Sequence, residues 1–199
     1  MTGFTTRCCT SVGDRIVRLV CVLGLVVTPL LAAASGENRV RYAEIVANEQ
    51  AYVVNADFDL DLNPTLIDAI SKGVSLYFVV EFQIERPRWY WFDEVVVTRR
   101  LQYRLNYHAI TRTYRLSVGN LHQSFESLDA ALRTLTRLRN WRIVEVRGLD
   151  SGTSYNAALR MRHDTSMLPR PFQVTAIGSR DWNLTTEWTR WTFLASPVR

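Results

Sequence analysis

A long run of alternating apolar and polar residues between Val74 and Arg86 most constrains the fold. Six apolar side chains recur at every second position: Val74, Leu76, Phe78, Val80, Phe82 and Ile84. Successive side chains of a β-strand point to opposite faces, so this spacing predicts a strand whose apolar face lies in the core. Glu81 and Glu85 are expected in solvent on the other face, where the apolar Val79 is the exception. One wet face is typical of an antiparallel sheet.

The same period of two predicts strands along most of the chain. The clearest further case is 95–107, in which Leu101, Tyr103 and Leu105 are expected to face the core. Additional strands are predicted at 41–48, 52–62, 114–118, 141–146, 153–162 and 183–194. In the last segment, Trp188 and Trp191 lie three positions apart, so a helix stays open as an alternative there.

Two short helices are predicted between the strands. The first begins at Asn63-Pro64, because Asn is a good N-cap and Pro suits the first helical position, and it ends at Gly73. The second follows Ser127 and extends to Asn140. Its apolar stripe is expected to comprise Leu128, Ala131, Leu132, Leu135 and Leu138. Three arginines near its end would complement the helix dipole: Arg133, Arg137 and Arg139.

These elements predict an α+β fold: a single domain dominated by antiparallel strands, with two short helices. A β-sandwich is one form that such a domain can take. The segment at 168–171, Leu-Pro-Arg-Pro, is expected to be an extended loop.

The first 34 residues have the three parts of a secretory signal peptide. Three arginines precede an apolar run at 19–31, and small residues follow at Ala32–Ala34. The run is shorter than the roughly 20 residues of a membrane-spanning helix, so cleavage after Ala34 is favoured over an uncleaved anchor. Residues 35–199 are then one exported, periplasmic domain, and they contain no cysteine.

No pattern in the sequence indicates a catalytic centre, a metal site or a cofactor. His108, His122 and His163 are widely separated and lack metal-ligand spacing. Phosphate-loop, dinucleotide and nucleophile-elbow motifs are missing from the sequence. Of the 24 cationic residues, Lys72 is the only lysine, and acids are interspersed among the arginines. The guanidinium group suits phosphate and carboxylate ligands, although a genome that favours arginine codons is the preferred explanation of the arginine bias.

The stretch RPRWYWFDE, residues 86–94, joins the two longest predicted strands. On a regular strand, Trp89 and Trp91 would share one face, and Tyr90 and Phe92 the other. Two interpretations are open: either both pairs are covered as core, or one pair is core and the other is presented to a partner with neighbouring arginines. The candidate binding surface comprises Arg86, Arg88, Trp89, Tyr90 and Trp91.

Four segments in this order resemble a known family: ERPRWYWFDEVV, LQYRLNYHAITRTYRLSVGNL, SFESLDAALRTLTRL and LPRPFQ. The family is a proteobacterial group of exported proteins, domain of unknown function 4390. The resemblance covers about residues 40 to 195. It implies a one-domain envelope protein and a gene neighbourhood with a two-component sensor kinase, and it brings no catalytic residues.

Two hypotheses about function follow. The first is a non-catalytic envelope binding module whose partner is a protein, a peptide, a membrane sensor or the membrane surface itself, since Trp, Tyr and Arg anchor interfaces and also lie at headgroups. Nucleic acid is not expected as a partner of an exported protein, and the net charge of the whole chain, leader included, is only +5. The alternative is an envelope hydrolase that uses acidic residues assembled by the fold.

Overall fold

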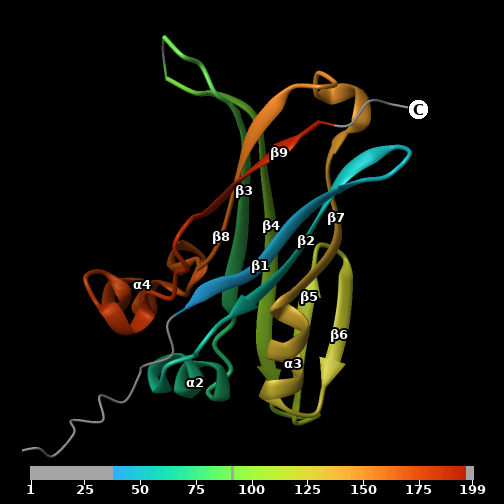
Figure 1. Cartoon of the computed structure of the whole chain (residues 1–199). Helices are drawn as coiled ribbons and strands as arrows, with labels where there is room; N and C mark the ends of the chain where they lie inside the picture. The colour runs from blue at the N-terminus through green and yellow to red at the C-terminus, as the bar shows by residue number, and fades with distance from the viewer. Residues whose placement is uncertain (1–37, 91, 196–199) are drawn as a thin grey trace, which may run out of the picture. The chain divides into compact units, whose positions relative to one another are not determined.

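The computed structural model describes residues 38–90 and 92–195. These residues form nine strands: β1 (Arg39–Ala47), β2 (Ala51–Asp59), β3 (Leu76–Arg86), β4 (Glu94–His108), β5 (Thr113–Val118), β6 (Leu121–Phe125), β7 (Arg137–Glu145), β8 (Ser154–His163) and β9 (Thr189–Leu194). The α-helices are α2 (Pro64–Ser71), α3 (Leu128–Leu135) and α4 (Arg170–Ala176) (Figure 1). Short 3-10 helices are η1 (Val146–Gly148), η2 (Thr165–Met167) and η3 (Arg180–Trp182).

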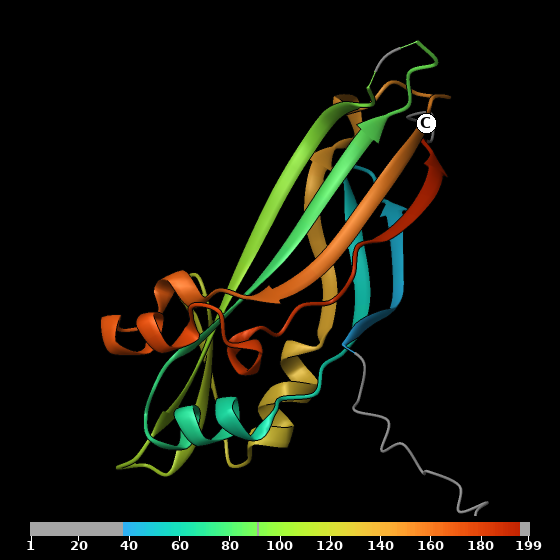
Figure 2. The same cartoon turned by 90° about the vertical axis from the view of Figure 1, so that its left-hand side faces the viewer.

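The strands form two sheets in which neighbouring strands are antiparallel. The smaller sheet has the order β1-β2-β7, and the larger has the order β6-β5-β4-β3-β8-β9. Figure 1 shows β1 and β2 lying across the larger sheet, and Figure 2 shows the same pair of layers from the side. The predicted α+β class, dominated by antiparallel strands, is confirmed, with three short α-helices in the described residues instead of two.

The core lies between the two sheets. Phe82 on β3 contacts Trp141 on β7 edge-to-face, with 6.2 Å between the ring centroids, and Tyr52 on β2 contacts Phe193 on β9 at the same spacing. These pairs join the inner faces of the two layers. The predicted alternation is confirmed, because Val74, just before β3, and the five apolar side chains from Leu76 to Ile84 on the same face are all buried. Val79, the exception on the opposite face, is buried as well.

Helix α2 forms as predicted. The side chain of Asn63 accepts a hydrogen bond from the backbone N–H of Leu66, and Pro64 occupies the first turn. Gly73 follows the helix with a φ of 85°, a left-handed conformation that glycine adopts without the Cβ clash of other residues. The helix therefore ends where the sequence predicts.

The second predicted helix is shorter than expected. Ser127 caps α3, but the helix ends at Leu135 and the chain enters β7 at Arg137. Leu138, expected on the helical stripe, is buried as a strand residue opposite Ala56 on β2. Arg137 and Arg139, expected at the helix end, also lie on β7. The physical reason is that pairing with β2 satisfies the backbone of this segment and buries Leu138, which outweighs the helical propensity of TRLRN.

Three other segments correct or extend the sequence predictions. The expected loop at 168–171 instead runs into α4, which starts at Arg170 with a proline in its first turn, a position where the missing N–H costs no helical bond. The segment 183–194 ends in strand β9 rather than in a helix. Strand β6 pairs with β5 and was not predicted, because most of its side chains are exposed and give a weak apolar pattern.

The predicted signal peptide, residues 1–34, lies outside the described residues. Within the described ranges, every helix is too short or too polar to cross a bilayer.

Candidate functional site

The loop that joins β3 to β4 carries exposed aromatic rings. We call residues 87–93 the aromatic tip. Trp89 is 94% exposed, Phe92 84% and Tyr90 66%. Trp89 and Tyr90 contact each other edge-to-face, with ring centroids 5.1 Å apart. Figures 1 and 2 both show this loop extending beyond the sheets, at the end opposite to α2 and α3.

The expectation that at least one aromatic pair of the tip is core is wrong for the described residues. Trp89 represents one pair, and Tyr90 with Phe92 forms the other, yet all three are exposed. Trp91 lies outside the described residues. The physical reason is that β3 ends at Arg86 and β4 begins at Glu94, so the aromatics lie on a loop to which strand alternation does not apply.

Ion pairs hold the base of the aromatic tip. Arg86 pairs with Asp150, and it also donates a hydrogen bond of 3.2 Å to the hydroxyl of Tyr155, which is buried. Arg88 pairs with Glu94 across the base of the loop. The two predicted arginines therefore support the tip and are already engaged with acids, while the rings of Trp89, Tyr90 and Phe92 are exposed to solvent.

The outer face of the six-stranded sheet collects arginines from distant parts of the sequence. It carries six of them: Arg100, Arg104, Arg115, Arg160, Arg162 and Arg190. The acids on the same face of β3 are Glu81 and Glu85. The sequence does not predict that these arginines gather on one face, because charges are spread evenly along it. Strands β4, β3 and β8 become neighbours only in the fold.

Glu81 lies at the centre of one group of these arginines. It was expected in solvent, but it is only 5% exposed, because arginines from both neighbouring strands cover it. Its carboxylate accepts from Arg160 at 2.7 Å and lies 3.4 Å from a nitrogen of both Arg100 and Arg162. We call these four residues the Glu81 cluster. The guanidinium group of Arg160 also stacks over the ring of Trp188, at 4.4 Å from its centroid.

The electrostatics of the Glu81 cluster keep the carboxylate ionised. Burial alone would raise the pKa of Glu81, but the hydrogen bond from Arg160 and the charges of the three arginines outweigh it, so the pKa lies below its ordinary value. Asp164 behaves alike: burial raises its pKa, and Ser166 and Arg162 together bring it below the ordinary value. The cluster is thus a paired, structural arrangement of charge.

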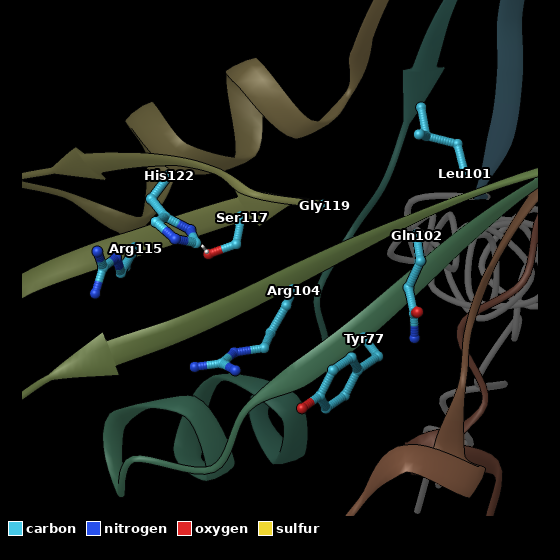
Figure 3. Close-up of a pocket in the computed structure, with 8 residues that line it drawn as sticks. All are labelled: Tyr77, Leu101, Gln102, Arg104, Arg115, Ser117, Gly119 and His122. Atoms are coloured by element: carbon cyan, nitrogen blue, oxygen red, sulfur yellow. Dashed lines mark hydrogen bonds between the residues drawn. The ribbon is translucent and has the colours of Figure 1, made fainter.

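A second group of residues, most of them on the outer face, surrounds a hollow of about 650 Å³. Its lining comprises Tyr77, Leu101, Gln102, Arg104, Arg115, Ser117, Gly119 and His122. We call it the arginine hollow. Figure 3 shows the side chains of Tyr77, Arg104, Arg115 and His122 around it. The strand register explains the convergence, because His122, Ser117, Arg104 and Tyr77 are successive partners in one row across four strands.

The polar groups of the arginine hollow differ from those of the Glu81 cluster. His122 Nδ1 and the Ser117 hydroxyl lie 3.1 Å apart and form a hydrogen bond (Figure 3). The guanidinium groups of Arg104 and Arg115 form no hydrogen bond or ion pair with any residue that the structure describes. Aspartate and glutamate are missing from the described lining. The hollow therefore presents donors whose positive charge is not balanced locally.

The remaining titratable groups do not converge on one centre. His108 bonds to Thr111, and His163 is buried with its Nδ1 donating to the carbonyl of Trp182 at 2.9 Å. In the described ranges, groups of three or more His, Asp or Glu able to hold a metal ion were not found. Two further carboxylates have a lowered pKa: Asp59, through its hydrogen bond from Arg41, and Glu44, through its hydrogen bond from Tyr42.

A family model for a domain of unknown function, DUF4390, matches residues 36–192. The chain belongs to this family. No match was found among curated proteins or among solved structures. The matched range contains the aromatic tip, the Glu81 cluster and the arginine hollow, so all three lie within the family's domain.

The aromatic tip of this DUF4390 domain can be predicted from the sequence, whereas the arginine hollow cannot. The tip is contiguous, and four neighbouring aromatics between two strands are visible in the sequence. The hollow takes residues from β3, β4, β5 and β6, and one of these strands was not predicted. The available signal is the polar alternation of Gln102, Arg104 and Asn106 on β4, but alternation alone predicts only that these side chains face solvent.

Proposed function

We propose that this protein is a non-catalytic binding module, exported to the periplasm and acting in the cell envelope, that docks to a partner protein through the aromatic tip. The observation that carries the proposal is the exposure of Trp89, Tyr90 and Phe92 together in one short loop. Exposed apolar groups gathered in this way mark interaction surfaces, and Trp and Tyr contribute a large share of binding energy at protein interfaces.

The charges at the tip favour a protein or peptide partner over a membrane surface. Arg86 is paired with Asp150 and Arg88 with Glu94, and Asp93 adds a further negative charge in the loop. The tip thus has no surplus of positive charge to attract anionic headgroups. A membrane sensor or another envelope protein fits this class of partner.

The carboxylates support a binding role over the alternative of a hydrolase. A general acid needs a carboxyl group whose pKa is raised toward neutral pH. Glu44, Asp59, Glu81 and Asp164 are all shifted in the opposite direction. The arginine, tyrosine and serine side chains that bond to these carboxylates give them a structural role as ion-pair and hydrogen-bond partners.

Site-specific photo-crosslinking in intact envelopes tests the docking surface. A crosslinking residue at Tyr90 should trap one defined protein, and the product should disappear when Trp89→Ser and Phe92→Ser are added. Ile110 provides the matched control, because it is 91% exposed and lies in the turn between β4 and β5. Equal products from both positions would contradict a specific surface. Binding of the wild type, but not the variant, to protein-free vesicles would identify a membrane partner instead.

N-terminal sequencing tests the proposed export. Protein recovered from the envelope should begin at or near Ser35, since the small residues at Ala32–Ala34 suit a signal peptidase. Membrane-bound protein that begins at Met1 would contradict cleavage and favour an N-terminal anchor.

A further inference from the structure

We infer that the arginine hollow is a binding site for a phosphate group, separate from the aromatic tip. Tyr77 lies nine residues before the end of β3, and the tip begins directly after that strand. At about 3.3 Å per strand residue, the two regions are roughly 30 Å apart. Ligand binding in the hollow and partner binding at the tip can therefore occur at the same time.

The hollow supplies hydrogen-bond donors from four neighbouring strands. Arg104 and Ser117 are directly paired, and Arg115 is the diagonal neighbour of Arg104, at the spacing of about 7–8 Å for such positions. Tyr77, paired with Arg104, adds a hydroxyl on the other side. When the Ser117 hydroxyl donates to Nδ1 of His122, the remaining ring nitrogen of His122 carries the proton and is a further donor.

Carboxylates near this face do not compete for the two arginines. Glu81 is engaged by its own cluster, and Asp164, whose backbone N–H bonds to the carbonyl of Tyr77, is held by Arg162 and Ser166. Arg104 and Arg115 consequently keep their full set of guanidinium donors exposed to the hollow, without any bond to a described residue. Two like charges on adjacent strands repel each other, and a bound anion would remove this repulsion.

The donor set fits phosphate better than carboxylate. A guanidinium group presents a planar fork that binds two oxygens of a phosphate, and two such groups match its charge of up to −2. A phosphate has three terminal oxygens, so it can also accept hydrogen bonds from the hydroxyl of Tyr77 and the ring of His122. A carboxylate that is engaged by two arginines would leave these two donors without a partner. The hollow has a volume of about 650 Å³, which is larger than a single phosphate ion needs. We therefore expect the phosphate to be part of a larger molecule.

Calorimetric titration of the purified full-length chain tests the site, with glycerol 3-phosphate as the soluble probe. Sedimentation with phosphatidylcholine vesicles, with and without phosphatidic acid, tests whether the phosphate is that of a lipid. The variant Arg104→Gln/Arg115→Gln should bind at least about tenfold more weakly to whichever probe the wild type binds. Arg104→Lys should bind with intermediate affinity, because it keeps the charge and loses the fork.

The matched control is Arg142→Gln/Arg147→Gln, which has the same net charge as the hollow variant. Both control arginines are exposed and lie on or next to β7, in the other sheet. Loss of binding only in the hollow variant supports the site. Binding of glycerol 3-phosphate would then indicate a soluble phosphate compound as the ligand, and binding only to vesicles with phosphatidic acid would indicate a lipid. Equal loss in both variants, or no binding of either probe by the wild type, overturns it. Matching thermal melts of all the variants exclude unfolding as the cause.

Discussion

The Glu81 cluster and the arginine hollow lie on the same sheet face but use their arginines differently. In the cluster, Glu81 is 5% exposed and bonded to arginines from both of its neighbouring strands. In the hollow, Arg104 and Arg115 have no acidic partner among the described residues. Arg100 and Arg104 share strand β4, the outer sheet face and the residue type. The presence of a neighbouring carboxylate therefore distinguishes an arginine that stabilises the fold from one that we propose is available to a ligand.

The largest effect on stability is expected from Glu81→Gln. Removing the charge leaves three arginines around a neutral amide, and breaking a buried ion pair typically costs 3–5 kcal/mol. The arginines reach solvent, which offsets part of this, so we expect a loss of about 2 kcal/mol in the free energy of unfolding, measured with urea. A change below about 0.5 kcal/mol would mean that the cluster is an ordinary surface group.

The same comparison predicts how stability depends on pH. The pKa of Glu81 is lowered by folding, so its stabilising contribution is complete above the ordinary value of 4.5 and is lost as pH falls through the lower folded value. The difference in unfolding free energy between wild type and Glu81→Gln should therefore shrink between neutral pH and about pH 3. A difference that is constant across this range would show that the charge of Glu81 is not the stabilising property.

Arg160→Gln should destabilise the protein less than Glu81→Gln but more than a change in the hollow. It removes one charged hydrogen bond and the contact with Trp188, with an expected cost of about 1–2 kcal/mol. The readout is the urea midpoint at neutral pH. Arg162→Gln is a useful reference, because Arg162 lies 3.4 Å from the carboxylate and, among the described residues, does not stack on an aromatic ring.

The smallest effect is expected from Arg104→Gln/Arg115→Gln. Neither side chain bonds to a described residue, so the melting behaviour should correspond to a change within about 0.5 kcal/mol in either direction. Thermal melting in phosphate-free buffer measures this. A loss comparable to that of Glu81→Gln would show that the hollow is structural and would remove the contrast between the two groups.

The sequence predicted those features that depend on local periodicity or local caps. The buried face of β3 and the start of α2 at Asn63 follow from neighbouring residues alone. The end of α3 did not, because Leu135 and Leu138 fit a helix spacing until β2 provides a partner strand for Leu138. Local propensity was outweighed there by tertiary pairing.

The candidate surfaces show the same division. The position of the aromatic tip can be recognised in the sequence from its contiguous aromatic residues. The exposure of its rings cannot, because it depends on the chain leaving strand β3 after Arg86. The burial of Glu81 depends on Arg160 and Arg162, about eighty positions later, and the hollow depends on four strands in register. Such long-range order has no signature in periodicity, since many strand orders satisfy one alternating pattern.

The most direct test of the distinction between paired and unpaired arginines is a nuclear magnetic resonance titration that follows the arginine Nε–Hε signals. Glycerol 3-phosphate is added to the purified protein, and single substitutions assign the signals of Arg104, Arg115 and Arg160. We predict that the signals of Arg104 and Arg115 move together with one saturating affinity, while that of Arg160 stays in place. Movement of Arg160 with no change at Arg104 and Arg115, or equal small shifts of all arginines, would contradict the account.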